Sequence, residues 1–255
     1  MGPLRQPDDP TTWILIPIFN HAATIEGVVR QVLEVVDLPC LIIDDGSGPE
    51  TRLALESLQQ GSERVSVHRL ESNRGKGAAL RRGFRIARDA GATHVIHLDA
   101  DGQHECADIP RFLAAIAAEP SALVLGKPVF DETVPGLRLY GRQLSRWVVW
   151  LCTLSFAVDD PLCGFRAVPL ESTLRLLERE SLGDRMEFEP GLAVVFQWTG
   201  LPVRNLATRV RYLEGGHSNF DGVRDTWRMA KLYGRLLARS LARLPGRVLR
   251  RRTPR

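Results

Sequence analysis

The chain has 255 residues, of which 44% are hydrophobic and 25% charged, and its formal net charge is +4 at pH 7. This length and composition allow one large α/β domain with appendages and a substantial core. The first ten residues include two aspartates and no apolar run, which excludes a signal peptide, and four cysteines without paired spacing fit a reducing compartment, so we expect a cytoplasmic protein.

Short apolar runs alternate with amphipathic segments in the first third of the chain. The apolar runs predict buried parallel strands at residues 13–16 and 40–43, and an alternating pattern predicts a further strand at 65–70. Between the first two runs, Thr24 could cap a helix whose apolar residues recur at helical spacing: Ile25, Val28, Val29, Val32, Leu33 and Val36. Further helices are predicted from about residue 50 to 59 and after residue 77. This alternation predicts a doubly wound, mostly parallel sheet.

Two polar turns in this region are candidate ligand sites. Asp44 and Asp45 follow the second strand, where acids can accept hydrogen bonds from a nucleobase or ribose, although a simple turn is the alternative. The segment Gly75–Gly77 lacks the later glycine of a dinucleotide fingerprint and the Ser or Thr that follows the lysine of a P-loop. Both of those motifs are therefore excluded. Lys76 at a helix amino terminus could still hold a phosphate, with a plain helix entry as the alternative.

Residues 94–104 change from an apolar strand into a cluster of oxygen ligands. In an extended backbone, Asp99, Asp101 and Gln103 share one face at the carboxyl end of the strand, where open α/β sheets bind ligands. Two carboxylates and an amide suit Mg²⁺ or Mn²⁺, which keep positions open for phosphate oxygens. A calcium loop would need an acid where Pro110 stands, and the cysteines lack zinc spacing. We therefore predict a metal site for a phosphorylated substrate, with a polar turn as the alternative.

The middle of the chain is less regular. A helix beginning near residue 108 and a strand at 122–125 are followed by a loop at 127–136 that could be a mobile lid. Residues 147–158 form the most apolar stretch, which is too short to span a bilayer and predicts a buried or interfacial helix. Its aromatic residues could pack in the core, which we favour, or contact a lipid chain: Trp147, Trp150 and Phe156.

Acidic and basic residues gather after that stretch. Asp160 and Arg166 lie close in sequence, and the pair Glu187 and Glu189 follows a predicted helix at about 172–180. The acid and the arginine could form a structural ion pair. Alternatively, the aspartate could take a proton from an acceptor while the arginine holds a phosphate. The residues alone leave both readings open.

Taken in order, these pieces resemble the family 2 glycosyltransferases of the GT-A fold, in particular the dolichol-phosphate mannosyltransferase-like branch that acts on polyprenyl-phosphate acceptors. The resemblance covers about residues 13–220 and rests on seven motifs: Ile16–Asn20, Ile42–Ser47, Asn73–Gly77, Asp99–Gln103, Asp160–Arg166, Glu187–Glu189 and Gly215–Ser218. It implies an α/β fold with a Rossmann-like, mostly parallel sheet flanked by helices. We expect a disordered segment at 1–12, the GT-A domain at 13–220, and a basic amphipathic C-terminal helix and tail at 221–255.

The resemblance implies metal-dependent, inverting transfer of one sugar from a nucleotide-sugar donor to a lipid-linked or polyprenyl-phosphate acceptor. The implied donor-binding residues are Pro17, Phe19, Asn20, Asp44, Asp45, Gly46, Lys76, Asp99, Ala100 and Asp101. Asp101 and Gln103 would bind Mg²⁺ or Mn²⁺. The candidate catalytic residues are Asp160 as base, Glu189 as the second candidate, and Asp99 beside the sugar. Arg166, Arg211 and Ser218 would bind the acceptor or a phosphate.

Several alternatives accompany this reading. A sugar-phosphate nucleotidyltransferase would use similar acids, and a membrane-binding module of the same fold would have no activity. The string Gln143–Trp147 matches a signature of processive polysaccharide synthases, but it precedes Asp160 instead of following the acidic base motif. We therefore expect transfer of a single sugar.

The positive charge is concentrated at the end of the chain. From Arg224 to Arg255 there are eleven basic residues and one acid, which leaves a net charge of −6 for the rest. The basic residues recur every three or four positions and predict a helix ended by Pro245 and Gly246: Arg224, Arg228, Lys231, Arg235, Arg239, Arg243 and Arg247. No aromatic residues interleave with the terminal arginines, so we expect no nucleic-acid partner. We favour an anionic membrane surface at the inner, cytoplasmic face over a helix that only packs on the domain.

Overall fold

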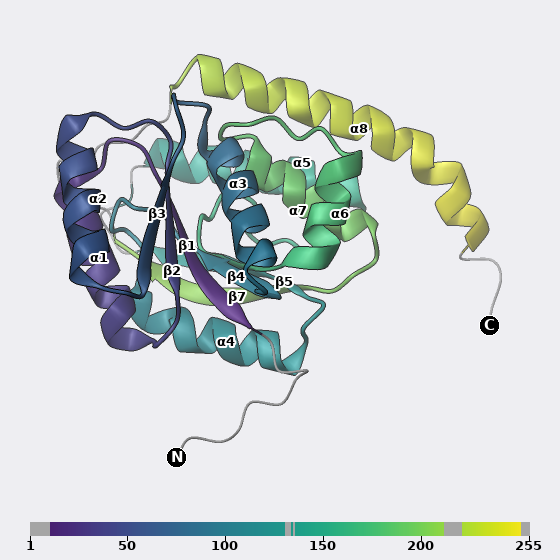
Figure 1. Cartoon of the computed structure of the whole chain (residues 1–255). Helices are drawn as coiled ribbons and strands as arrows, with labels where there is room; N and C mark the ends of the chain where they lie inside the picture. The colour runs from purple at the N-terminus through teal and green to yellow at the C-terminus, as the bar shows by residue number, and fades with distance from the viewer. Residues whose placement is uncertain (1–10, 131–133, 135, 212–220, 251–255) are drawn as a thin grey trace.

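One mixed sheet forms the centre of the molecule (Figure 1). The computed structural model describes residues 11–130, 134, 136–211 and 221–250. Within this part, seven strands are arranged in the order β3-β2-β1-β4-β6-β5-β7. Their bounds are β1 Thr12–Ile18, β2 Cys40–Asp44, β3 Val65–Arg69, β4 His94–His97, β5 Leu123–Phe130, β6 Arg166–Pro169 and β7 Val203–Val210. Only the two pairings of β6 are antiparallel, which confirms the predicted mostly parallel α/β sheet.

Helices cover both faces of the sheet (Figure 1). The helices on one face are α1 Ala22–Val35, α2 Pro49–Gly61 and α4 Ile109–Ala118, and those on the other are α3 Lys76–Asp89, α5 Gly136–Thr153, α6 Leu170–Arg179, α7 Phe188–Trp198 and α8 Arg224–Arg250. Side chains alternate along β1, so that Leu15 lies in one core and Ile14 and Ile16 lie in the other. Each face of the sheet therefore has its own hydrophobic core.

The strand directions bring distant segments to one edge. Because β1, β2, β3 and β4 are mutually parallel, their carboxyl ends lie together. Both β4 and β5 are antiparallel to β6, so β5 and its parallel neighbour β7 also end at this edge. The loop that enters β6 reaches the same edge, where Arg166 pairs in register with His97. This edge therefore brings together four segments: the turn at Asp44 and Asp45, the turn after β4 with Asp99 and Asp101, the loop containing Asp160, and the end of β7.

Three local predictions were wrong. Helix α1 begins at Ala22, and Thr24 lies in its first turn, where its hydroxyl donates to the carbonyl of Ala100 at 2.6 Å. Residues 127–130 of the predicted loop extend β5, because β7 supplies a paired strand that the local sequence does not reveal; residues 131–133 and 135 lie outside the described part. Helix α8 continues past Pro245 to Arg250, since a proline removes one helical hydrogen bond without having to end the helix.

The predicted apolar helix at 147–158 is only partly buried. Helix α5 ends at Thr153, and Val149 and Cys152 on one side of it are fully buried. On the opposite side Trp147 is 66% exposed, and Phe156 in the following turn is 77% exposed. Core packing therefore explains one side of this helix only. No helix in the described ranges is long and apolar enough to cross a membrane.

Helix α8 packs against the domain through part of its predicted basic stripe. Leu232 and Leu236 are buried in the core, and Arg239 forms two hydrogen bonds with Glu180. The guanidinium groups of Arg239 and Arg243 lie over the ring of Trp198, and Arg235 donates to the carbonyl of Ser181. Arg235, Arg239 and Arg243 of the stripe are therefore directed at the protein.

Candidate active site

A mostly enclosed lysine between two carboxylates lies at the centre of the convergent edge. Lys76 is the first residue of α3, and its ammonium nitrogen lies 2.6 Å from Asp99 Oδ1 and 2.6 Å from Glu189 Oε2. Burial opposes the charge of the lysine, but the two carboxylates outweigh it and raise the pKa of Lys76 above its ordinary value. Although burial alone would raise it, Lys76 and His104 hold the pKa of Asp99 well below its usual range. Lys76 and Asp99 are therefore both charged at neutral pH.

Arg166 lies beneath this cluster. Its side chain is 0% exposed, and it donates to the main-chain carbonyls of Pro161, Cys163 and Glu189 at 2.6 to 2.8 Å. Its Nε also lies 3.7 Å from Glu189 Oε1. The sequence predicted an acceptor contact for this residue, but the structure places the guanidinium inside the protein with its donors directed at the chain. Arg166 therefore fixes the loop that enters β6 and the start of α7.

Asp45 supports the turn that precedes Lys76. Its two carboxylate oxygens accept hydrogen bonds from the backbone N–H groups of Arg74 and Gly75, both at 2.7 Å. Burial raises the pKa of Asp45 even though these two N–H groups lower it. Gly75 has a φ of 106°, and a Cβ at this position would lie 2.4 Å from the carbonyl oxygen of Asp184. Asp45 thus shapes the turn that presents Lys76.

Asp44 and Asn20 shape the rim at the ends of β1 and β2. Asp44 is buried, pairs with Arg69 and accepts the N–H of Ser47 at 2.8 Å. Asn20 adopts a φ of 57°, receives the N–H of Gly48 on its side-chain oxygen at 2.7 Å and donates its own N–H to Ser47 Oγ. Both aspartates of the first acidic turn are therefore engaged with the protein. The polar surface at this rim comes from Asn20, which is exposed.

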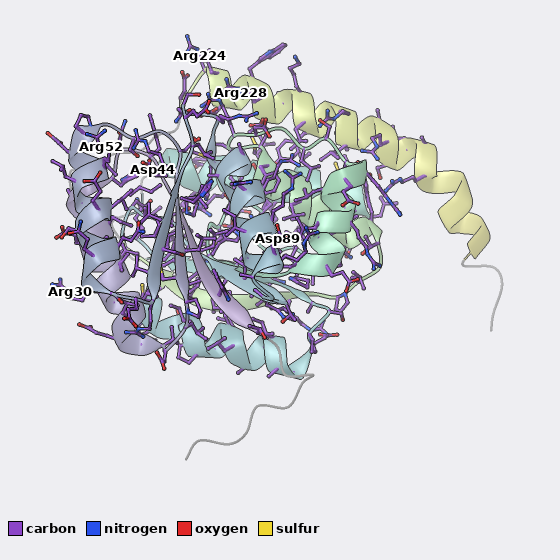
Figure 2. The ribbon with its side chains drawn as sticks, in the orientation of Figure 1. Arg30, Asp44, Arg52, Asp89, Arg224 and Arg228 are labelled. Atoms are coloured by element: carbon purple, nitrogen blue, oxygen red, sulfur yellow. The ribbon has the colours of Figure 1, made fainter. Side chains whose placement is uncertain are left out.

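The remaining predicted donor-binding residues line or support the same rim. Pro17 and Ala100 are buried, whereas Phe19 is half-buried. Gly46 has a φ of 77°, and a Cβ there would lie 2.7 Å from the backbone of Ser72. The turn after β2 can therefore approach the turn before α3 only because residue 46 is a glycine. In Figure 2 Asp44 lies in the upper half of the molecule, and helix α8 begins above it with Arg224 and Arg228.

The segment Asp99–Gln103, called the DxD segment after Asp99 and Asp101, offers few ligands to a cation, in a setting that favours positive charge. Asp101 Oδ1 accepts the N–H of Gln103 at 3.0 Å, and burial together with the adjacent Asp99 raises the pKa of Asp101. Asp99 is already paired with Lys76. Within the described residues no group of three or more His, Cys, Asp and Glu side chains could enclose a metal. Asp101 and Gln103 therefore fit a Mg²⁺ or Mn²⁺ ion that takes its other ligands from water and phosphate.

The loop containing Asp160 packs directly against this segment. A Cβ on Gly164 would lie 2.1 Å from Asp99 Oδ2, so a larger residue there would displace the carboxylate from its place beside Lys76. Asp160 is buried, its Oδ2 lies 2.7 Å from Arg142 Nη1, and its Oδ1 accepts the N–H of Leu162 at 2.8 Å. Asp160 and Glu189 thus belong to neighbouring parts of one site but have different partners.

Some functional residues fall outside what the sequence suggested. Arg142 holds Asp160 from α5, and no local pattern links these two positions. His97 is buried beside Glu189, and its place in an apolar strand gave no sign of a polar contact. Arg211 is exposed and lies 3.8 Å from Glu105, while Ser218 lies outside the described residues.

Comparison with known proteins identifies the family. Residues 13–182 match the sequence model described as glycosyl transferase family 2, which is two thirds of the chain. The chain belongs to glycosyl transferase family 2. This glycosyltransferase is 24% identical over 232 residues to a dolichyl-phosphate beta-glucosyltransferase from Mus musculus, covering 82% of this chain and 70% of the relative. It is 32% identical over 165 residues to a polyprenol monophosphomannose synthase from Mycolicibacterium smegmatis, covering 61% of this chain and 60% of the relative.

A solved structure confirms the fold of the glycosyltransferase. Glucosyl-3-phosphoglycerate synthase from Mycobacterium tuberculosis, in complex with Mn²⁺, uridine diphosphate and phosphoglyceric acid, matches with a TM-score of 0.68 and 21% identity, over 91% of this chain and 78% of that one. The GT-A fold, the family and the glycosyltransferase activity predicted from the sequence are confirmed. The nucleotidyltransferase and the non-catalytic module are thereby set aside.

The charged cluster makes a prediction about pH. In a Lys76→Met variant, the buried Glu189 and the partly exposed Asp99 lose their shared cation, and we expect a loss of about 3–5 kcal/mol of unfolding free energy at pH 7. Asp99 has a lowered pKa in the wild type, so its contribution is present above its unfolded pKa of about 3.9 and is lost as the pH falls. In the variant, Asp99 lacks its cation and takes up a proton more readily than in the wild type, so the deficit of the variant should shrink from pH 7 towards pH 4.

Urea unfolding across this pH range measures the deficit. The control is Lys127→Met, because that lysine pairs with Asp159 at 2.9 Å near the surface and should contribute less than about 1 kcal/mol. A deficit for Lys76→Met that is the same at both ends of the pH range would contradict the electrostatic role of the lysine.

Proposed function

We propose that this glycosyltransferase moves one sugar, with inversion, from a nucleotide-sugar donor to a lipid-linked or polyprenyl-phosphate acceptor in a reaction that needs Mg²⁺ or Mn²⁺. The observation that carries the proposal is the contact between the DxD segment and the loop of Asp160, made by Gly164 against Asp99. A donor bound at the DxD segment would have its sugar beside the loop of Asp160. The names of the polyprenyl-dependent relatives support the choice of acceptor.

The donor would lie across the ends of β1, β2 and β4. We assign contacts with the base and ribose to Phe19 and Asn20 at the rim, with Pro17, Asp44 and Asp45 shaping that rim from inside. Lys76 lies beside Asp99 at the amino terminus of α3 and would bind the diphosphate there. When bound at Asp101 and Gln103, the metal ion would neutralise charge on the departing diphosphate.

Asp160 is the proposed base. Its carboxylate is held by Arg142, which keeps it oriented, and it would exchange this partner for the acceptor's nucleophile. The freed guanidinium would then be available to a phosphate of the acceptor. Glu189 is the weaker candidate because it lies 2.6 Å from Lys76 in a buried position. Arg211 and Ser218 stay proposed acceptor contacts, while Arg166 would act through the loop that it supports.

We also propose that the enzyme acts at the inner face of the membrane as a peripheral protein. Arg224 and Lys231 on α8 are exposed, and Trp227 between them is 65% exposed. On α5, Trp147 and Leu151 form an exposed apolar side one helical turn apart. Exposed aromatic and basic residues on neighbouring helices suit the interface of an anionic bilayer.

Isothermal titration with UDP and GDP tests the donor and metal assignments together. We expect one nucleotide to bind in the presence of Mn²⁺ and to be lost in EDTA, because a diphosphate next to Asp99 and Asp101 would otherwise be repelled. Asp101→Ala should abolish this binding, whereas Asp108→Ala, which removes a surface pair with Arg111, should not. Unchanged binding or turnover in EDTA would exclude the metal site.

Catalysis by Asp160 is tested by comparing rate with affinity. Asp160→Asn should bind nucleotide as the wild type does, while transfer to dolichyl or undecaprenyl phosphate falls by about 10² to 10⁴. Asp159→Asn, the neighbouring acid that pairs with Lys127, is the matched control and should keep the rate. If Asp160→Asn instead loses nucleotide affinity and keeps its rate, the residue belongs to the donor side and Glu189 becomes the base candidate.

Membrane contact is tested with surface variants, because removing α8 would uncover Leu232 and Leu236. Co-sedimentation with anionic vesicles should weaken by about tenfold or more in Arg224→Glu/Lys231→Glu, given about 1 kcal/mol for each basic residue near the surface. The control Arg30→Glu/Arg52→Glu makes the same charge change on α1 and α2, away from α8 (Figure 2). Equal vesicle binding by both double variants, or vesicle binding that does not depend on anionic lipid, would contradict the proposed membrane contact.

A further inference from the structure

Two unsatisfied polar groups face each other beside the charged cluster. His97 is 1% exposed, and neither of its ring nitrogens has a hydrogen-bond partner among the described residues. Glu189 Oε1 is also buried without a hydrogen bond there, and it lies 3.9 Å from His97 Nδ1. A buried polar group without a partner is costly, and this separation is too long for a hydrogen bond. The arrangement is therefore incomplete in this state of the protein.

A small movement of the Glu189 side chain would form a hydrogen bond between its carboxylate and His97. The other carboxylate oxygen, Oε2, lies 2.6 Å from Lys76. A rotation that brought Oε1 within hydrogen-bond distance of His97 would lengthen this contact with the lysine. Arg166 lies 3.7 Å from the same oxygen, Oε1, so positive charge would remain beside the carboxylate. Glu189 thus has two alternative partners, the lysine and the histidine.

The donor gives a reason for the exchange. Lys76 also contacts Asp99, at the point where the diphosphate is proposed to bind. A diphosphate there would attract the ammonium group and weaken its hold on Glu189. Burial, together with Lys76 and Arg166, lowers the pKa of His97 well below its ordinary value, so the ring is neutral and can donate one N–H.

We propose that His97 is a positioning residue that takes over the carboxylate of Glu189 through Nδ1 when Lys76 turns to the donor diphosphate. The inference rests on the proposed function, since it needs a diphosphate at this site. The buried histidine would be a second hydrogen-bond partner for Glu189. Lys76 could then move to the diphosphate without leaving the buried carboxylate of Glu189 unpaired. Glu189 would in turn be a holder of Lys76 in the free enzyme.

The variants His97→Phe and His97→Asn separate this role from packing. Phenylalanine keeps a ring without a donor, whereas the amide nitrogen of asparagine can occupy the place of Nδ1. Binding of UDP and GDP, each with Mg²⁺, should weaken by about tenfold in His97→Phe and recover to within about threefold of the wild type in His97→Asn. His94→Phe makes the same change at the start of β4, where the ring bonds to the carbonyl of Pro120, and should leave nucleotide affinity unchanged.

A spectroscopic measurement on the wild type completes the test. The ¹⁵N signals of the His97 ring, assigned by their loss in His97→Asn, should shift on saturation with the nucleotide and Mg²⁺ as Nδ1 becomes a donor. Unchanged signals, or wild-type affinity in His97→Phe, would overturn the inference while the donor site stands. If the wild type binds neither nucleotide, the proposed function fails and the inference falls with it. Should His97→Phe not fold, the ¹⁵N signals and His97→Asn decide the question.

Discussion

The sharing of one buried ammonium group by Asp99 and Glu189 is the interaction on which the rest of the site depends. Lys76 opens α3, Asp99 follows β4 and Glu189 lies in the first turn of α7, so a single cation joins three elements that are distant in sequence. Without the lysine, two carboxylates in this largely enclosed place would lose the positive charge that they share. Charge pairing therefore fixes the relative positions of the helix, the strand end and the second helix.

Hydrogen bonds between charged side chains and the main chain hold this cluster in place. Asp45 shapes the turn before Lys76, and Arg166 ties the loop entering β6 to the start of α7. Close approaches at glycines complete the arrangement, because Gly164 lies against Asp99 and a side chain at Gly77 would meet Phe188 at 2.5 Å. The site is thus prepared by backbone geometry before any ligand arrives, which is what a donor with a diphosphate requires.

The sequence reveals the fold well because the determinants of the sheet are local. Apolar runs of four or five residues next to amphipathic helices specify parallel strands, and each acidic turn follows a strand end, as in the structure. What the sequence hides depends on contacts across the fold. The extension of β5 needs β7, the pairing of Arg142 with Asp160 needs α5 to cross the loop, and Arg166 reads as a ligand contact until its burial is known. A charged side chain at a site has the same sequence signature whether it faces the ligand or the interior.

A double-mutant cycle between Lys76→Met and Glu189→Gln measures the central claim most directly. Free energies of unfolding for the wild type, both single variants and the double variant give the coupling energy of the pair without assigning either residue a catalytic role. The account predicts a coupling of about 2–3 kcal/mol, with the double variant more stable than Lys76→Met alone because no unpaired carboxylate remains at residue 189. Additive effects within about 0.5 kcal/mol would contradict it, since the two groups would then contribute independently to the fold.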